Sequence, residues 1–198
     1  MKLLLQIFAL VGLLTSLGCV TTKEETRVSS SLSAREYNEI YSTYSKRPTW
    51  VTLRKMSDGN SVLTIEMEQY AYNPTASHAP EHMTPYRVSF DERFADQYIS
   101  LIDKYLEWES KAQKRGDAFT KIIGKANTWA AMGTLKLGFY FHSGNESSHL
   151  LMVGLDLGIS GVVDEQYYER KDAIKLKDLI LQMKLGEIKH TEIDAVYN

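Results

Sequence analysis

The chain has 198 residues, which suits one ordinary domain. Hydrophobic residues make up 43% and charged residues 24%, so a globular core can form. A net charge of -2 is too balanced to favour nucleic acid or an anionic membrane surface as a partner.

Residues 1–18 have the layout of a secretory signal peptide. Lys2 supplies a positive start, residues 3–14 are mostly apolar, and small residues precede Cys19. The apolar stretch is short for a membrane-spanning helix, which needs about 20 residues. The sequence therefore predicts an exported chain, and an uncleaved membrane anchor is the alternative.

Cys19 is the only cysteine and directly follows Gly18. This junction resembles the lipobox of bacterial lipoproteins, which ends in Gly-Cys or Ala-Cys. The family pattern has leucine and then a small residue before that pair. Ser16 and Leu17 stand here in the reverse order, which the permissive form of the motif tolerates. The resemblance implies a diacylglycerol on the Cys19 sulfur and cleavage after Gly18. A lone buried cysteine is the alternative interpretation.

Val20 follows the cysteine at the position that directs sorting in Gram-negative lipoproteins. By that resemblance, valine rather than aspartate implies the outer membrane, facing the periplasm. Residues 19–32 are polar and rich in Thr and Ser, which predicts a flexible lipidated tether. Residues 33–198 are then one soluble domain, without cysteine and so without disulfides.

The first predicted element of the domain is a short helix. Ser33 and Glu36 have the spacing of a helix capping box, and Pro48 lies just past the end of the segment. Aromatic and apolar residues recur between them at helical spacing: Tyr37, Ile40, Tyr41 and Tyr44. We expect this stripe to pack on the domain; a ligand-binding stripe is the alternative.

The rest of the domain predicts two runs of three strands, each followed by an amphipathic helix. The first run comprises residues 50–56, 61–72 and 86–90, then a helix capped by Ser89 or Asp91 and ended by Gly116. The second run comprises residues 132–142, 148–157 and 162–169, then a helix capped by Asp172 and ended by Gly186. Residues 187–198 alternate weakly and predict one more strand.

The two runs also share short motifs. Thr49-Trp50 and Thr128-Trp129 each precede a Thr-Leu-basic triplet and then a Gly-Asn turn. We therefore predict an α+β fold, with an antiparallel sheet, two main amphipathic helices and a duplicated β-β-β-α unit. Chance similarity between strand-rich segments is the alternative to duplication.

No motif in the sequence indicates a reaction. Gly158–Gly161 lacks the G-x-S-x-G spacing of a nucleophile elbow and is interpreted as a turn. The sequence contains neither a phosphate-binding P-loop nor a dinucleotide fingerprint. We therefore predict no catalytic residues and no cofactor.

Histidines offer the nearest approach to a metal site. His78 and His82 lie four apart, but Pro80 between them disfavours the helix that would align them. His142 and His149 flank the second turn and could share a metal if the strands pair around it. Surface histidines beside a turn are the simpler interpretation, so we predict no metal site.

Two pairs of glutamates were considered as acid catalysts, Glu66 with Glu68 and Glu107 with Glu109. Acid catalysis needs carboxylates held across a cleft with separated pKa values. Neighbours on an outward face are more simply solvated charges, and we interpret all four in this way.

The leading functional hypothesis is a non-catalytic lipoprotein, held in the membrane by lipid on Cys19. It would bind an envelope protein or a small ligand, and no nucleic acid. One alternative is an envelope hydrolase whose site is assembled only in three dimensions. The other is a structural component of the envelope.

Overall fold

The structure, a computed structural model, describes residues 20–39, 41–70, 83–129 and 135–188. Within these residues the chain forms ten strands in two antiparallel sheets and two α-helices. This confirms the predicted α+β class with an antiparallel sheet. The signal peptide, Cys19 and all but the first two residues of the predicted C-terminal strand lie outside the described residues.

The first sheet has four described strands in the order β1-β4-β5-β6. They are β1 (Thr22–Val28), β4 (Thr49–Met56), β5 (Ser61–Tyr70) and β6 (Met83–Asp91). A tight turn joins β4 to β5, and Gly59 in it has a φ of 87°. The Asp58-Gly59 pair predicted this turn, because glycine adopts positive φ at no steric cost.

The second sheet has six described strands in the order β3-β2-β10-β9-β8-β7. They are β2 (Arg35–Asn38), β3 (Thr43–Lys46), β7 (Thr120–Thr128), β8 (Leu135–Asn145), β9 (Ser148–Asp156) and β10 (Val162–Tyr168). Gly158–Gly161 forms the turn between β9 and β10, as predicted, with a 3-10 helix at Gly158–Ser160.

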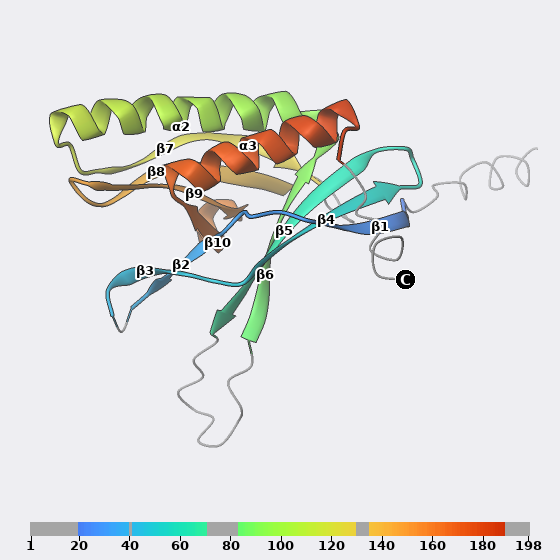
Figure 1. The fold of residues 1–198 in the computed structure, drawn as a ribbon, viewed down its shortest axis with the longest axis horizontal. Coiled ribbons are helices and arrows are strands. Elements are labelled where there is room, and N and C mark those ends of the chain that lie inside the picture. The colour runs from blue at the N-terminus through green and yellow to red at the C-terminus, as the bar shows by residue number, and fades with distance from the viewer. Residues whose placement is uncertain (1–19, 40, 71–82, 130–134, 189–198) are drawn as a thin grey trace, which may run out of the picture.

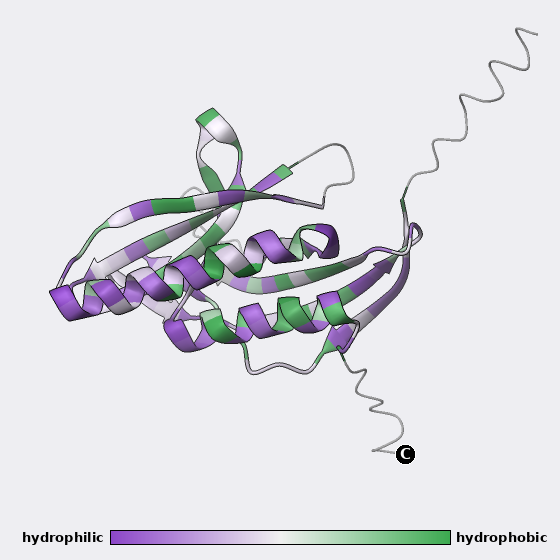
Figure 2. Cartoon of the chain, turned by 90° about the horizontal axis from the view of Figure 1, so that it is seen from above, coloured by the Kyte–Doolittle hydropathy of each residue, from purple (hydrophilic) through white to green (hydrophobic). Residues whose placement is uncertain are grey.

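The two predicted helices are present as α2 (Ala95–Arg115) and α3 (Arg170–Leu185). Both lie on one side of the six-stranded sheet (Figure 1). Hydrophilic and hydrophobic residues alternate along each helix (Figure 2), as the amphipathic pattern requires. Gly116 and Gly186 end the helices in left-handed conformation, as predicted. Asp172 is not the cap of α3; it lies buried in the first turn.

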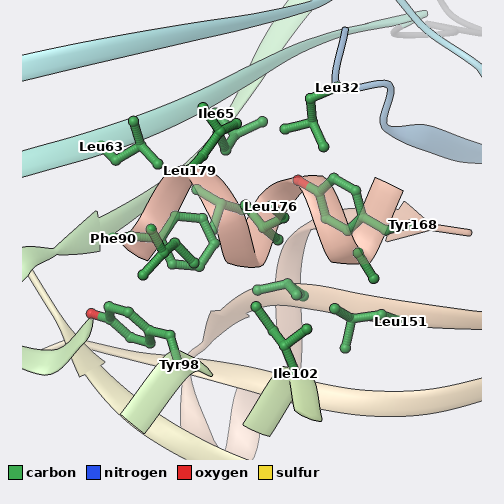
Figure 3. Close-up of a cluster of buried hydrophobic side chains, with 14 of the residues drawn as sticks. Leu32, Leu63, Ile65, Phe90, Tyr98, Ile102, Leu151, Tyr168, Leu176 and Leu179 are labelled. Carbon is green, nitrogen blue, oxygen red and sulfur yellow. The ribbon is translucent and has the colours of Figure 1, made fainter. Parts of the chain in front are cut away.

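Both sheets and both helices share one core, with α3 lying between strand β5 and helix α2 (Figure 3). Its fully buried members include Leu63, Ile65, Phe90, Tyr98, Ile102, Leu151, Tyr168 and Leu176. Burial of each such side chain contributes about 1.5–3 kcal/mol. Most of the helix-covered face of the six-stranded sheet is thus filled by packing, whereas neither α2 nor α3 covers the opposite face (Figure 1).

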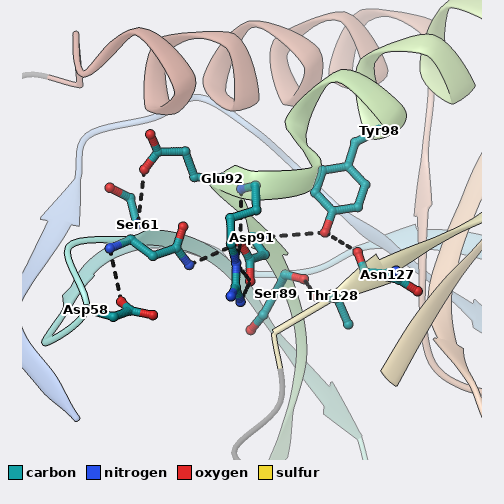
Figure 4. Close-up of polar contacts among 10 residues, drawn as sticks. Asp58, Ser61, Ser89, Asp91, Glu92, Tyr98, Asn127 and Thr128 are labelled. Atoms are coloured by element: carbon teal, nitrogen blue, oxygen red, sulfur yellow. Dashed lines mark hydrogen bonds and ion pairs between the residues drawn. The ribbon is translucent and has the colours of Figure 1, made fainter. Parts of the chain in front are cut away.

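A polar junction fixes the start of α2 against both sheets (Figure 4). Buried Asp91 accepts hydrogen bonds from the Arg93 backbone at 3.0 Å and from Asn60 Nδ2 at 3.0 Å. Burial works to raise the pKa of Asp91, but the bonds from Arg93 and Asn60 hold that pKa below its usual value. Tyr98 donates to the Asn127 carbonyl at 2.5 Å. The Asp91 carboxylate therefore has hydrogen-bond partners from Asn60 and Arg93, and its role is structural.

The predicted N-terminal helix is wrong, because residues 35–46 form the β2–β3 hairpin. Tyr37 pairs with Tyr44 across the strands, with ring centroids 5.0 Å apart. Arg35 pairs with Tyr167 and joins the hairpin to β10. Tyr37 and Tyr44 are seven residues apart, a spacing that fits one face of a helix and also a cross-strand pair in a hairpin. Pairing with β10 favours the hairpin.

The predicted flexible tether is also wrong for most of its length. Residues 22–28 form β1, which pairs with β4 along its length, and Leu32 is buried in the core. Thr21 is bonded to Ser57 in the β4–β5 turn. The folded body therefore begins three residues after Cys19, a link that spans at most about 10 Å.

The order of elements repeats, as the duplicated unit requires. β4-β5-β6-α2 and β8-β9-β10-α3 are each an antiparallel meander followed by a helix. Each meander also gains an edge strand that was not predicted, β1 beside β4 and β7 beside β8. Trp50 lies within β4 whereas Trp129 lies before β8, so the two tryptophans do not occupy equivalent places.

The buried side chain of Gln166 on β10 joins the sheets. Its Nε2 donates to the carbonyls of Ile65 at 3.1 Å and Tyr86 at 3.2 Å. It therefore holds the start of β6 beside β10.

Neither described helix has the length and apolar character needed to cross a bilayer.

Candidate functional site

The face of the six-stranded sheet away from the helices carries a second, smaller aromatic and apolar cluster. Its members are Tyr44, Tyr140, Leu150, Met152, Val162 and Tyr167. His142 lies among them, edge-on to the rings of Tyr44 and Tyr167. Leu150, Met152 and Tyr167 are buried, whereas Tyr44, Tyr140 and Val162 are partly exposed, so part of this face is open to a partner.

His142 has both ring nitrogens engaged. Nε2 is bonded to the Tyr44 hydroxyl, and Nδ1 lies 2.9 Å from Thr120 Oγ1. Burial lowers the pKa of His142, so the imidazole is neutral near pH 7. Burial also raises the pKa of Tyr44, which keeps its hydroxyl protonated. Neither group is poised to act as a base or to bind a metal.

The shared metal considered for His142 and His149 is ruled out by the strand register. His149 pairs with Ser143, the residue after His142, so the two imidazoles point to opposite faces of the sheet. His149 Nδ1 lies 2.8 Å from Ser143 Oγ, and Phe141 packs beside its ring. The described residues contain no group of three potential metal ligands.

The other candidate residues have varied outcomes. His78 and His82 lie outside the described residues. Glu66 and Glu68 are partly exposed and line one shallow hollow on the four-stranded sheet. Glu109 contradicts the interpretation as a solvated charge: it is only 3% exposed and forms an ion pair with Arg170. Glu107 is exposed, as expected.

A cleft of about 390 Å³ lies where β10, the β2–β3 hairpin and β6 meet. We call it the tyrosine–carboxylate cleft; it is lined by Glu36, Tyr37, Glu39, Tyr86, Val162, Val163, Asp164, Glu165 and Tyr167. Neither His142 nor His149 lines it.

An irregularity in β10 presents the carboxylates to this cleft. The pairing with β9 shifts between Val163 and Gln166, and Asp164 between them has a φ of 55°. Positive φ is uncommon for a residue with a side chain. Gly154 on β9 lies against the bulge, since a Cβ there would stand 2.8 Å from the Val163 carbonyl oxygen. Glycine at 154 therefore permits the bulge.

We expect Gly154→Ala to lower the free energy of unfolding by about 1–3 kcal/mol, because the added methyl overpacks this approach. Urea denaturation monitored by circular dichroism measures the change. Gly144→Ala is the matched control: its Cβ would meet nothing closer than 3.5 Å and its φ is not positive. Equal losses in the two variants would contradict this account of the bulge.

The cleft is strongly negative. Burial raises the pKa of Tyr86, and the carboxylates of Asp164, Glu36 and Glu165 raise it further. Tyr167 donates to Glu165 at 2.5 Å, and Arg47 pairs with Glu36 at 2.5 Å. Arg47 is the one cation that the described contacts place on these carboxylates. The arrangement is suited to a positively charged group.

Asp164 is the most unusual group of the cleft. Burial raises the pKa of its carboxyl. No hydrogen bond or ion pair is described for this carboxylate within the residues that the structure covers. An ionised, half-buried carboxylate without a cation, on a strained backbone, reduces stability and indicates a functional role.

None of these residues was predicted from the sequence. The available signal is in Val162-Val163-Asp164-Glu165, where two adjacent acids follow two valines and the strand lacks regular alternation. Such an interruption indicates a bulge. The positions of Glu36 and Tyr86 beside it depend on contacts between distant segments and have no local signal.

The chain was also compared with known proteins. No protein-family model matches it, and neither the curated proteins nor the solved structures gave a match.

Proposed function

We propose that this protein is a non-catalytic binding module of the bacterial cell envelope, lipid-anchored through Cys19 at the outer membrane. Its ligand site is the tyrosine–carboxylate cleft, and it takes an ammonium or guanidinium group of a partner. The observation that carries the proposal is the gathering of four carboxylates and three tyrosines around one cleft.

The chemistry of the cleft supports a cationic ligand. Tyrosine ring faces attract cations by about 0.5–1 kcal/mol at exposed sites and more when water is excluded. Carboxylates form charge-assisted hydrogen bonds with the same groups. A cation placed near Asp164 would offset the cost of burying its carboxylate. A basic side chain of an envelope protein carries both the positive charge that the tyrosine rings attract and the N–H groups that the carboxylates bind.

The position of the cleft is consistent with anchoring. The chain enters the domain at Thr22, at one end of the molecule, and β2 and β3 lie toward the other end (Figure 1). With the lipid at Cys19 held close to the folded body, the cleft stays remote from the attachment point. A partner in the periplasm can then reach it.

We expect Asp164→Asn to weaken binding and to stabilise the fold. The probe is acetyl-Gly-Lys-Gly-amide, titrated against the detergent-solubilised protein and followed by NMR of labelled tyrosines. The loss of one facing charge should weaken binding about tenfold. The norleucine analogue, which lacks the ammonium, should not bind. Asp178→Asn, an exposed change on helix α3, should leave binding unchanged.

The expected effect of Asp164→Asn on folding stability is an increase at neutral pH. Because burial raises the pKa of Asp164 in the folded state, the ionised carboxylate lowers stability at pH 7. Asn removes that penalty and suits the positive φ, so the gain should be about 0.5–1 kcal/mol at pH 7. The gain due to charge should vanish as the pH falls below about 3.9, the unfolded value. Stabilisation with unchanged binding would contradict the proposed site.

A further inference from the structure

A second cleft lies on the helix side of the six-stranded sheet. It is about 280 Å³ in volume, and we call it the Trp108 cleft; it is lined by Trp108, Lys111, Ala112, Arg115, Asp117, Phe119 and Lys121. It is formed by the C-terminal end of α2 and the segment that leads into β7. These elements lie at the left-hand end of Figure 1, opposite the entry of the chain at Thr22.

The floor of the Trp108 cleft is aromatic. The rings of Trp108 and Phe119 have centroids 6.3 Å apart, and Phe119 stacks on Phe141 at 4.5 Å. Phe141 is fully buried, whereas Phe119 is 37% exposed. The floor is thus continuous with the core and held by it, while its outer surface is open to a ligand.

The rim of the cleft is positively charged. Lys121 lines the cleft, and its Nζ lies 5.6 Å from the centroid of the Trp108 ring. Lys104 lies beside the cleft, with its Nζ 5.1 Å from the same centroid. No ion pair within 4 Å is described for either ammonium in the part of the chain that the structure covers. Lys104 donates to the Ile123 carbonyl at 3.3 Å and lies close enough to Glu107 to lower the pKa of that carboxyl. Two like charges beside one ring are favoured by the ring but repel each other. An anionic group in the cleft would be attracted by both charges.

The remaining charges set the geometry of the rim. Lys111 is paired with Glu107, and Arg115 is paired with Asp117 at 2.6 Å. These pairs leave Lys104 and Lys121 as the available cations. A ligand that fits therefore has an apolar group for Trp108 and Phe119 and negative charge beside it.

The size of the cleft selects among such ligands. Sites for small molecules and cofactors usually enclose about 300–1,000 Å³. This cleft has room for about one aromatic or aliphatic side chain. Protein interfaces commonly rely on one such anchor in a pocket, surrounded by charged groups that set register and association rate.

We infer that the Trp108 cleft binds an acidic segment of a partner protein, with one apolar side chain packed on the floor formed by Trp108 and Phe119. Lys104 and Lys121 contact the flanking carboxylates. This surface is independent of the tyrosine–carboxylate cleft, because the two lie on opposite sides of the six-stranded sheet and select opposite charges.

Fluorescence anisotropy of a labelled peptide, acetyl-Asp-Glu-Phe-Glu-Asp-amide, tests the inference with the detergent-solubilised full-length protein. The peptide should bind, and the combined Lys104→Gln and Lys121→Gln variant should weaken binding about tenfold. Replacing phenylalanine in the peptide by alanine should weaken binding to a similar extent. Raising the salt concentration should weaken binding by the unchanged protein more than binding by the double variant.

Lys114→Gln is the matched control, since Lys114 is exposed on α2, does not line the cleft and is not among the cations described over the Trp108 ring. It should leave binding within about twofold of the unchanged protein. Both lysines of the test variant are exposed, so their loss should leave the thermal unfolding curve in place. An absence of binding at millimolar peptide, or equal loss in the Lys114 control, would overturn the inference.

Discussion

A chain carrying Cys19→Ala is expected to incorporate no fatty acid, whereas the unchanged chain is labelled by radioactive palmitate. The reason is chemical, because the thioether to diacylglycerol can form only on the Cys19 sulfur, the single thiol of the chain. Each buried methylene contributes about 0.8 kcal/mol, so two or more chains anchor firmly where one is marginal. The effect is therefore all or none.

Fractionation alone would not decide the matter, because an uncut apolar segment at residues 3–14 could itself hold the variant in the membrane. Mass spectrometry of the native N-terminus gives the sharper readout: we expect cleavage after Gly18 and acyl mass on Cys19. Globomycin should make the precursor accumulate. An intact Met1, or a cut chain with a bare thiol, would refute the lipid anchor.

Val20→Asp is the matched variant for sorting. It leaves the cysteine in place, so palmitate labelling should persist. By the resemblance to Gram-negative lipoproteins, aspartate at this position should shift the protein from the outer to the inner membrane fraction. Loss of palmitate label in this variant would show that Val20 is needed for lipidation itself and would contradict a role in sorting alone.

The elements that could be predicted are those whose own residues carry the signal. Helix α2 was found because its buried residues recur every three or four positions, and Gly116 ends it. Strands β4 and β5 were found because Asp58-Gly59 marks the turn between them. In each case local propensity and tertiary packing favour the same structure.

The elements that could not be predicted depend on distant partners. β1 is an edge strand that buries only Val28, so its polar residues carry no alternating signal. In β7 the register shifts between Ile122 and Gly124, which breaks the alternation that would have revealed a strand. Without β7, the contacts of Lys121 with Trp108 were invisible to the sequence analysis.

The candidate sites were missed for the same reason. The tyrosine–carboxylate cleft joins three segments: residues 36–39, Tyr86 and residues 162–167. Contacts between β6 and β10, among them the hydrogen bond from Gln166 to the Tyr86 carbonyl, bring Tyr86 beside them. Charges judged one segment at a time look solvated, and Glu109 is the clearest case of that error.

The largest change in stability is expected from Arg170→Met, which leaves the Glu109 carboxylate buried without its ion-pair partner. Arg170 Nη1 contacts Glu109 Oε2, and Gln113 Nε2 donates to Oε1 at 2.6 Å. The Glu109 side chain is 3% exposed and the Arg170 side chain 48%. Breaking a fully buried pair costs about 3–5 kcal/mol. Because Arg170 is half exposed, we expect about 2–4 kcal/mol, measured by urea denaturation.

A double-mutant cycle separates the pair from the burial of the charge. Glu109→Gln keeps the shape and removes the charge, so combining it with Arg170→Met should restore much of the lost stability, with a coupling of about 1–3 kcal/mol. Lys111→Met is the matched control on the same helix. Its exposed pair with Glu107 should contribute far less to stability, because water screens both groups. Equal losses of stability in Arg170→Met and Lys111→Met would show that the burial of Glu109 does not set the strength of its ion pair between α2 and α3.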